Sequence, residues 1–392
     1  AAGYHLAVLA AFKYTGFLTG GAVAPSWVPL GLSFFTFQQL WLLKEAYTGE
    51  FRPDQAGAQP LYAFFFPTVT SGPILRPGAF FPQLKREKCL APDGTDLAAG
   101  LYAICCGMVK KVLLADPLGV VVNNGWARAG DLSAPAAWLV MLAYTFQLYL
   151  DFSGYCDIAA GAARLLGVRL PVNFDSPYRA LSVGAFWKRW HITLTTFLRE
   201  CLYIPLGGSR RGRGRTYANI LLVFLASGLW HGAGWTFLVW GGLHGLAQIL
   251  ERAWGVGRER LPAALRWGLT FLFLNVAWVF FRAPDLPAAG ALMSAAVSGG
   301  LALPEAWLLE GLLSAEQTAL AAAAPALAEP LAWLALGGIG AAAAWASLLP
   351  GNTIRRMDTF RPTLWRGAAL AVLGSWCVLS FSGITTFIYS NF

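Results

Sequence analysis

Long apolar runs alternate with short polar stretches along almost the whole chain. The apolar runs lie near 4–20, 25–46, 100–123, 136–160, 218–232, 234–251, 267–282, 285–302, 332–350 and 366–388. A helix needs about 20 predominantly apolar residues to cross the hydrocarbon core of a bilayer. The pattern therefore predicts an all-α protein with many membrane-spanning helices.

Some stretches do not fit a simple span. Residues 49–60 are polar, and 82–98 carry enough charge to predict a loop outside the membrane. Residues 64–78 contain prolines and glycines that break a straight helix. Residues 169–215 are too charged to span and too apolar for a solvated loop. Polar backbone at membrane depth is tolerated only where protein buries it or a cavity adjoins it, so we expect short re-entrant or in-plane helices in 169–215.

The chain is interpreted as one membrane domain, 1–392. Within it, residues 303–331 are rich in Ala and Leu with scattered Glu, which indicates an amphipathic connector. The chain does not begin with Met and starts inside an apolar stretch. We therefore expect that N-terminal residues, and with them N-terminal helices, precede this sequence.

Composition supports the membrane assignment. The chain is 57% hydrophobic and 12% charged, whereas about a quarter of residues are charged in soluble proteins. The net charge of +9 comes from cations between apolar runs, which is typical of cytoplasmic loops rather than nucleic-acid binding. The sharpest cluster, SRRGRGR, predicts a loop near lipid headgroups; its cations are Arg210, Arg211, Arg213 and Arg215. The six cysteines form no C-x-x-C pair, so neither zinc nor disulfides are indicated.

Polar residues inside one apolar run share a helical face. Tyr144, Gln147, Asp151 and Tyr155 are spaced by three, four and four residues, with Asp157 close to the end of the stripe. Such a stripe faces the protein interior rather than lipid. Two interpretations remain open: a ladder of hydrogen bonds between helices, or the lining of a substrate tunnel.

The four histidines differ in their surroundings. His5 lies at the start of the chain and is interpreted as incidental, while His191 lies among cations and hydroxyls in FWKRWHITLTTFLRE. His231 follows Trp230 in GLWHGAGW, where glycines permit close approach of another backbone. His244 would lie about 220° further round a continuous helix. The pair is therefore not a metal site, and His244 is expected to be a hydrogen-bonded packing residue.

A buried histidine can be a satisfied packing residue or a proton-transfer group, and neutral imidazole suits the second role near neutral pH. The glycines around His231 favour the second role there. The sequence has no G-x-S-x-G elbow and no phosphate-binding loop. If the protein is an enzyme, the attacking group should therefore come from a substrate.

Several motifs resemble the membrane-bound O-acyltransferase family, most closely its bacterial branch that acetylates alginate and other exported polysaccharides. The specific stretches are YTFQLYLDFSGYCDIAAGAARLLG, PVNFDSPYRALSVGAFWKRWHITLTTFLRECLYIPLGG and RTYANILLVFLASGLWHGAGWTFLVWGGLHG. LGLSFFTFQQL, FFFPTVTSGPILRP, NVAWVFFRAPD and the terminal TTFIYSNF fit the same branch. Many relatives read Asp and Tyr where this chain has Glu200 and Cys201, a departure expected to affect only local packing.

The resemblance implies a helical membrane fold around a central tunnel, with His231 as the catalytic histidine and His191 as the second one. Further residues that it places at the substrate or donor tunnel are Trp230, Asn173, Asp175, Lys188, Arg189 and Arg199. The cations among them could hold donor phosphates or pair with Asp175 or Glu200. No metal or bound cofactor is expected.

The same resemblance implies partners and a location. The acyl thioester donor, acetyl-CoA or a carrier-bound acyl group, would come from the cytoplasm. The acceptor would be an exported polysaccharide or an extracytoplasmic acetyltransferase, and the protein would lie in the bacterial cytoplasmic membrane, without nucleic acid. The alternative is a transporter or scaffold that moves acyl groups or polymer without chemistry.

Overall fold

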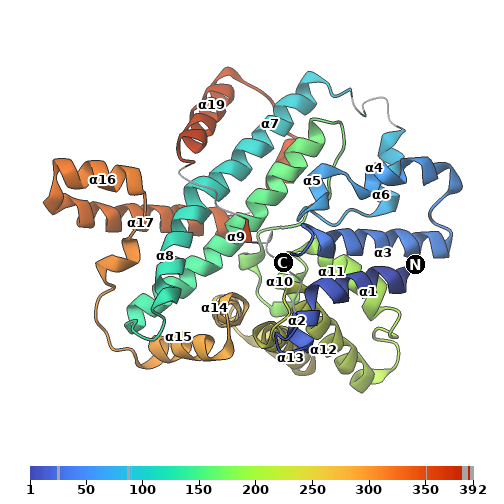
Figure 1. Cartoon of the computed structure of the whole chain (residues 1–392), viewed down its shortest axis with the longest axis horizontal. Coiled ribbons are helices and arrows are strands. Elements are labelled where there is room, and N and C mark those ends of the chain that lie inside the picture. The colour runs from blue at the N-terminus through green and yellow to red at the C-terminus, as the bar shows by residue number, and fades with distance from the viewer. Residues whose placement is uncertain (24–26, 86–88, 90, 350, 382–386, 389–392) are drawn as a thin grey trace.

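The computed structural model describes residues 1–23, 27–85, 89, 91–349, 351–381 and 387–388. Every regular element within these ranges is helical (Figure 1). The longer helices are α1 (Ala2–Lys13), α3 (Leu32–Thr48), α7 (Gly94–Met108), α8 (Asp116–Ala127), α9 (Ala134–Arg164), α12 (Gly212–His231), α13 (Trp235–Trp254), α14 (Ala263–Arg282), α15 (Leu286–Ser298), α17 (Pro325–Leu348) and α19 (Leu364–Leu379).

Shorter helices connect these elements. They are α2 (Thr15–Leu18), α4 (Gln59–Ala63), α5 (Phe66–Val69), α6 (Pro77–Leu84), α10 (Val183–Trp187), α11 (Ile192–Leu198), α16 (Ser314–Ala323) and α18 (Thr353–Met357). The 3₁₀ segments are η1 (Pro53–Ala58), η3 (Pro177–Arg179), η5 (Gly255–Arg260) and η6 (Ala306–Leu309), and the π-helical segments are η2 (Val109–Ala115) and η4 (Arg199–Tyr203).

One continuous helical rod organises the molecule. Helices α7 and α8, joined by η2, lie beside α9 across the middle of the structure (Figure 1). Glycines permit the close approach: a Cβ added to Gly107 would lie 2.5 Å from the carbonyl oxygen of Gly154, and one added to Gly161 would lie 2.6 Å from that of Gly100. Small residues at such crossings let helix backbones pack tightly where lipid supplies no hydrophobic driving force.

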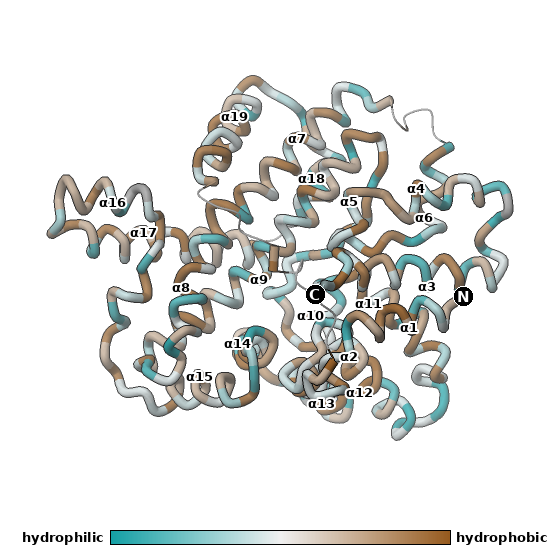
Figure 2. Tube along the Cα trace, in the orientation of Figure 1, coloured by the Kyte–Doolittle hydropathy of each residue, from teal (hydrophilic) through white to brown (hydrophobic). Residues whose placement is uncertain are grey.

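The other helices surround this pair. Helices α1 and α3–α6 lie on one side, α12–α15 lie below, and α16 and α17 project away from the body (Figure 1). Hydrophobic positions are distributed along most helices, and not only on inward faces (Figure 2). Leu364 is 84% exposed and Leu334 is 71% exposed. Apolar side chains on both faces are typical of helices in lipid.

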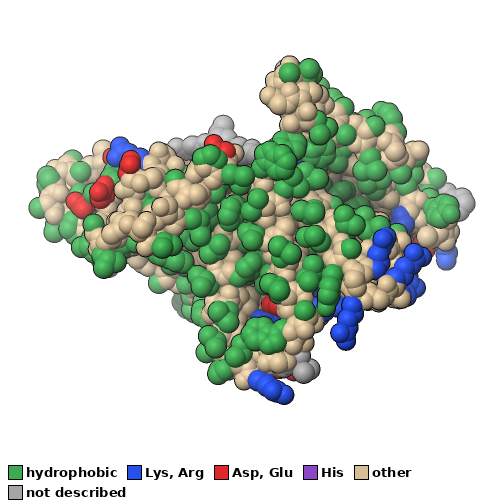
Figure 3. All heavy atoms as spheres, turned by 90° about the horizontal axis from the view of Figure 1, so that it is seen from below, with side chains coloured by type: hydrophobic (Ala, Val, Ile, Leu, Met, Phe, Trp, Pro, Cys, Tyr) green, Lys and Arg blue, Asp and Glu red, His purple; other side chains and the backbone are tan. Residues whose placement is uncertain are grey.

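Among the described residues, three helices are long and apolar enough to cross a membrane: Gly94–Ala127, Ala263–Arg282 and Pro325–Leu348. The spans expected at 285–302 and 366–388 correspond to α15 and α19, which have 13 and 16 residues. Both are apolar; α15 ends before Gly299, and α19 ends before Ser380. Figure 3 shows one face on which hydrophobic side chains cover most of the area, with Lys and Arg side chains gathered mainly toward one edge.

The stretches that do not fit a simple span consist of short helices and turns in the structure. Residues 169–215 contain only α10, α11, η3, η4 and the start of α12, and much of this segment is buried. The prolines and glycines of 64–78 separate α5 from α6. Residues 303–331 hold η6, α16 and the first turns of α17, so the last long span begins earlier than expected. Parts of 82–98 and most of TTFIYSNF lie outside the described residues.

Candidate functional site

His231 is the last residue of α12, and the chain reverses at once into α13. The turn is glycine-rich, and glycines also set the distance between the two helices: a Cβ on Gly228 would lie 2.3 Å from the carbonyl oxygen of Phe237, and one on Gly241 would lie 2.4 Å from that of Phe224. The helix is therefore not continuous between His231 and His244. The two histidines belong to separate, tightly packed helices.

His244 is a hydrogen-bonded packing residue, as expected. It is fully buried on α13, and the indole Nε1 of Trp187 donates to its Nδ1 over 3.1 Å. Its ring also lies edge-on to Trp240 and Phe273 at centroid distances of 4.9 and 5.2 Å. This histidine thus joins α10 to α13 and α14 within the aromatic core.

His191 occupies an unusual backbone position. It is the N-cap of α11, with φ at 44° and ψ at 52°, in the left-handed region that non-glycine residues rarely adopt. Such a conformation costs on the order of 1 kcal/mol and persists only where the surroundings hold it. Here the next two amides hold it: Ile192 donates to the carbonyl oxygen of Asn173 over 2.9 Å, and Thr193 donates to Asn173 Oδ1 over 3.2 Å.

The Asn173 side chain fixes the orientation of the His191 ring. Asn173 Oδ1 accepts from the Thr193 hydroxyl over 2.9 Å, and it lies 3.2 Å from His191 Nδ1. Asn173 Nδ2 donates to Cys156 Sγ over 3.3 Å, which leaves Oδ1 as the acceptor. His191 Nδ1 therefore carries a proton, and in the neutral ring Nε2 carries the lone pair. The hydroxyl of Thr193 also accepts from the Ile74 amide, which ties this network to the segment between α5 and α6.

His191 and His231 come together in the core. Their ring centroids are 6.5 Å apart, and both side chains are almost fully buried. Trp230 lies edge-on to both rings, at centroid distances of 6.0 Å from His191 and 4.8 Å from His231. Phe152 covers His191, and Phe281 covers His231. The structure thus places two imidazoles in one dry, aromatic enclosure.

Helix α1 covers the carboxyl end of α12, beside His231. The Tyr14 hydroxyl donates to the carbonyl oxygen of Leu229 over 2.9 Å, and the Lys13 ammonium donates to that of Trp230. Lys13 also donates to the Ser33 hydroxyl over 3.1 Å. A cation at this end of a helix complements the macrodipole. The sequence analysis missed Lys13; a lone cation in an apolar run was the available signal.

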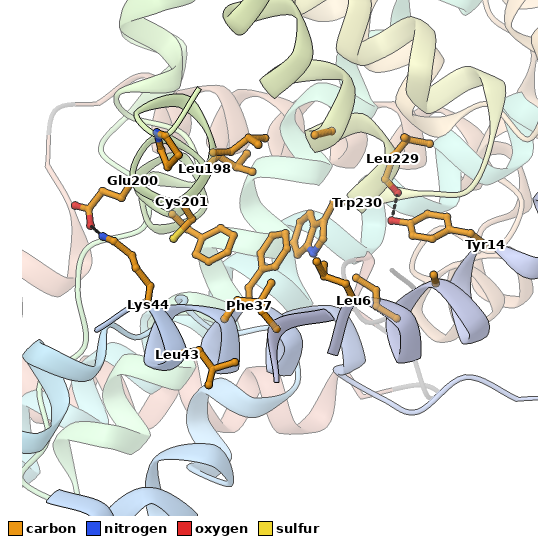
Figure 4. A pocket seen from close by; sticks show the side chains of 18 of the residues that line it. Leu6, Tyr14, Phe37, Leu43, Lys44, Leu198, Glu200, Cys201, Leu229 and Trp230 are labelled. Atoms are coloured by element: carbon orange, nitrogen blue, oxygen red, sulfur yellow. Dashed lines mark hydrogen bonds and ion pairs between the residues drawn. The ribbon is translucent and has the colours of Figure 1, made fainter. Parts of the chain in front are cut away.

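An apolar pocket of about 980 Å³ adjoins this region, between α1, α3, α11, η4 and α12. Figure 4 shows Trp230 and Phe37 facing its interior, the Tyr14–Leu229 hydrogen bond at one end, and the pair of Lys44 and Glu200 toward the other. Trp230 thus forms part of the wall between the pocket and the adjacent His231.

The charged end of this pocket is an ion-pair cluster. Glu200 lies 3.1 Å from the Lys44 ammonium and 3.7 Å from the guanidinium of Arg76. Arg76 also pairs with Glu45 over 2.8 Å, and this hydrogen bond raises the pKa of Arg76. Glu45 is buried and further accepts from the Gly78 amide over 2.9 Å. The cluster therefore joins α3, α6 and η4 around the pocket mouth.

The polar stripe of α9 makes contacts between helices. Asp151 lies 2.6 Å from the ammonium of Lys111, and Asp157 lies 2.6 Å from that of Lys110. Both lysines belong to η2, the π-helical turn opposite α9. Polar groups at such depth pair with one another, and π-helical turns occur often at functional sites. The sequence analysis did not single out these lysines, although two cations within an apolar run were a visible signal.

The rest of the stripe follows the same pattern. The hydroxyls of Tyr155 and Thr70 are 2.5 Å apart, and a Cβ on Gly119 would lie 2.6 Å from Gln147 Nε2, so α8 passes close to that amide. Tyr144 is buried in the core. None of the stripe residues is among those that line the 980 Å³ pocket in the described chain. These contacts favour the interpretation as a ladder between helices.

The remaining expected tunnel residues are engaged in other contacts or are exposed. Asp175 pairs with Arg355 over 3.2 Å, and its carbonyl oxygen accepts from Arg189 over 3.2 Å. Lys188 and Arg199 are exposed, and Glu200 pairs with Lys44 and Arg76 rather than with any of the expected cations. Within the described ranges, no three His, Cys, Asp or Glu side chains are grouped to hold a metal ion.

Comparisons with known proteins agree with this geometry. Residues 60–283 match the sequence profile of the MBOAT, membrane-bound O-acyltransferase family. The chain is 41% identical over 291 residues to a peptidoglycan O-acetyltransferase of Helicobacter pylori, covering 67% of this chain and 55% of that protein. It is 38% identical over 331 residues to a probable alginate O-acetylase AlgI of Azotobacter vinelandii, covering 80% and 64%.

A more distant relative is a teichoic acid D-alanyltransferase of Streptococcus thermophilus, 28% identical over 258 residues, which cover 60% of this chain and 61% of that protein. The chain thus spans between about half and two thirds of the length of the curated relatives it matches. The family match includes His191 and His231, the asparagine that orients His191 and the helix pair that carries His231. The protein belongs to the membrane-bound O-acyltransferase family.

Proposed function

We propose that the protein is an O-acyltransferase that moves an acetyl group from a cytoplasmic thioester donor toward hydroxyls of an exported cell-envelope polysaccharide. The observation that carries the proposal is the pair formed by His191 and His231, whose rings lie 6.5 Å apart in a buried aromatic enclosure. A dry site of this kind protects a reactive thioester from hydrolysis.

In the proposed mechanism, His231 acts as the general base. Its imidazole removes the proton from the acceptor hydroxyl while that oxygen attacks the thioester carbonyl carbon. The C–S bond then breaks, and the leaving sulfur takes the proton from the imidazolium, so that an ester and a free thiol are formed. Positioned proton transfer of this kind contributes about 10²–10⁴-fold to a rate.

His191 orients the acceptor in this scheme. Its Nδ1–H points at Asn173 Oδ1, so in the neutral ring Nε2 is the hydrogen-bond acceptor. A neutral Nε2 without a proton cannot donate to an oxyanion. Of the roles considered for His191, orientation of a hydroxyl therefore fits the local network better than oxyanion stabilisation.

The apolar pocket beside Trp230 supports an acyl donor as substrate. It is lined mainly by aliphatic and aromatic side chains and adjoins the residue before His231. Lys44 at its charged end is held by Glu200. A hydrocarbon acyl chain matches the apolar wall, and the pantetheine-like arm of a thioester donor would extend toward the charged end.

The relatives support an acceptor and a location for the proposed reaction. Proteins named for acetylation of peptidoglycan and alginate share 38–41% identity with this chain. We infer an exported polysaccharide as the final acceptor, reached directly or through an extracytoplasmic acetyltransferase, and the bacterial cytoplasmic membrane as the location. The donor would be acetyl-CoA or an acyl group on a carrier.

The test is the ester-linked acetyl content of the exported polymer in cells that produce His231→Ala in place of the wild type. The proposal expects nearly complete loss of acetyl groups at unchanged protein level in the membrane. A transporter or scaffold without chemistry would survive this change with reduced turnover. Normal acetylation by the variant would refute the proposed enzyme.

A further inference from the structure

A second, polar pocket lies away from the histidine pair, where α10, α13, η5 and α14 meet. Its volume is about 350 Å³. Three arginines line it, from the end of α13, from η5 and from the first turn of α14: Arg252, Arg258 and Arg266. Two carboxylates, Glu251 and Glu259, line it as well.

One of the acidic groups is already neutralised within the fold. Glu251 pairs with Arg258 over 3.1 Å and accepts the amides of Val183 and Gly184 at the start of α10 over 2.8 and 3.0 Å. Arg258 also donates to the carbonyl oxygen of Leu181 and to the Thr270 hydroxyl. Glu251 and Arg258 thus line the pocket as a paired anion and cation, whose charges largely cancel.

The other two arginines are less constrained by the fold. The Nε atom of Arg266 is buried, and no group in the described part of the chain accepts a hydrogen bond from it. Arg252 makes one long contact, 3.5 Å to the Ser209 hydroxyl. Among the described residues that line the pocket, the carboxylate of exposed Glu259 is the one not already paired with Arg258, so the guanidinium groups of Arg252 and Arg266 give the pocket a positive potential. Arginine forks of this kind suit a phosphate oxyanion.

The flanks of the pocket are apolar and exposed. Leu250 and Trp254 on α13 are 68% and 57% exposed, and Leu265 and Leu269 on α14 are 48% and 49% exposed. Helix α14 is one of the helices long and apolar enough to cross the membrane, and Arg266 lies in its first turn. Exposed apolar side chains therefore lie on both helices that carry these arginines, and Arg266 stands at the end of a helix long enough to cross the membrane.

We propose that this pocket binds the phosphate of an anionic phospholipid, with the glycerophosphate between Arg252 and Arg266 and the acyl chains along the exposed leucines of α13 and α14. Basic pockets at the ends of membrane helices favour anionic lipid headgroups. The site is separate from the histidine pair, so its occupancy is measured without any enzymatic assay.

The test is lipid binding to the purified, full-length protein in detergent, measured by native mass spectrometry with phosphatidylglycerol as the probe. The double variant Arg252→Gln/Arg266→Gln should bind about 25-fold more weakly, because each surface cation contributes about fivefold. Arg260→Gln is the matched control, because Arg260 belongs to the same segment and does not line the pocket. Arg252→Lys/Arg266→Lys keeps the charge without the fork, so it should bind more weakly than the wild type and more tightly than the double Gln variant.

Several outcomes would overturn the proposal. Equal loss in the Arg260 control would indicate general surface attraction rather than a site. Undiminished binding by the double Gln variant would place the lipid elsewhere. Phosphatidylcholine binding as tightly as phosphatidylglycerol would contradict selection of an anionic headgroup. Inorganic phosphate or glycerol 3-phosphate binding as tightly as the lipid would identify a soluble phosphate as the ligand. A melting temperature within the wild-type range shows that the variant is folded.

Discussion

The ring of His191, the N-cap of α11, lies 6.5 Å from the ring of His231, the last residue of α12, measured between centroids. Contacts close to each histidine fix the position of its ring. A left-handed backbone and the amide of Asn173 hold the first, and a glycine-packed helix pair holds the second. Substitutions at these contacts should therefore lower the rate of acetyl transfer although both histidines are kept.

The contact between α12 and α13 can be tested at adjacent glycines. Gly241→Ala would place a Cβ 2.4 Å from the carbonyl oxygen of Phe224 and force the helices apart. We expect a loss of about 1–3 kcal/mol of unfolding free energy, as for an overpacked core, together with reduced transfer. Gly242→Ala is the control, since its Cβ would meet nothing within 4 Å. The melting temperatures of the two variants are compared by thermal unfolding in detergent. Equal melting temperatures would contradict the role of the contact between α12 and α13.

The orientation of His191 can be tested at Asn173. In Asn173→Ala the acceptor for His191 Nδ1 and for the Thr193 amide is lost. Because a displacement near 1 Å can cost about 100-fold in rate, we expect acetyl transfer per folded protein to fall by about that factor. The control is Asn219→Ala, which removes a buried amide that donates to the carbonyl oxygens of Leu206 and Gly208. It should lower stability without the same loss of rate, and a matching loss would refute the orienting role.

The effects of Lys111 and Asp151 on the free energy of unfolding should be coupled, because the two side chains form an ion pair. Asp151→Asn alone leaves a buried cation poorly compensated, although Asp116 also lies 2.8 Å from Lys111. Breaking a buried pair typically costs about 3–5 kcal/mol. The double variant Lys111→Met/Asp151→Asn should be more stable than the sum of the single changes predicts. A double-mutant cycle of unfolding free energies measures this; strict additivity would mean that the pair is not coupled.

His244 should be dispensable for chemistry. His244→Phe keeps a ring in the aromatic core but leaves the Trp187 indole N–H without its acceptor. We expect a loss of about 1–3 kcal/mol in stability, with transfer per folded protein close to that of the wild type. The second expectation is measured as acetyl-transfer activity divided by the amount of folded protein. If a stably folded His244→Phe variant transferred no acetyl groups, His244 would be required for the reaction itself.

Local patterns predicted much of the site. Glycines flanking His231 indicated close backbone approach, and the structure has this contact at Gly228. The separation of His231 from His244 was also expected, but from the rotation of a continuous helix. Its actual cause is a chain reversal after His231, for which the following Gly-Ala-Gly was the signal.

Other features depend on contacts between distant segments. Glu200 pairs with Lys44 and Arg76, which lie more than 120 residues before it in the chain. A single sequence does not show that these segments meet, and Lys188 and Arg199 were the expected partners because they are close to Glu200 in the chain. The π-helical turn that presents Lys110 and Lys111 to α9 leaves no periodic signature in a short apolar run. Such features depend on tertiary packing, which overrides local preference.

The central claim is that His231 accepts the proton of the attacking hydroxyl. The most direct measurement is the rate of acyl transfer from an acetyl thioester by purified full-length protein, in the wild type and in His231→Gln, at matched melting temperatures. The account predicts a loss of at least about 100-fold in the variant. Transfer by a folded His231→Gln protein at the wild-type rate would contradict it.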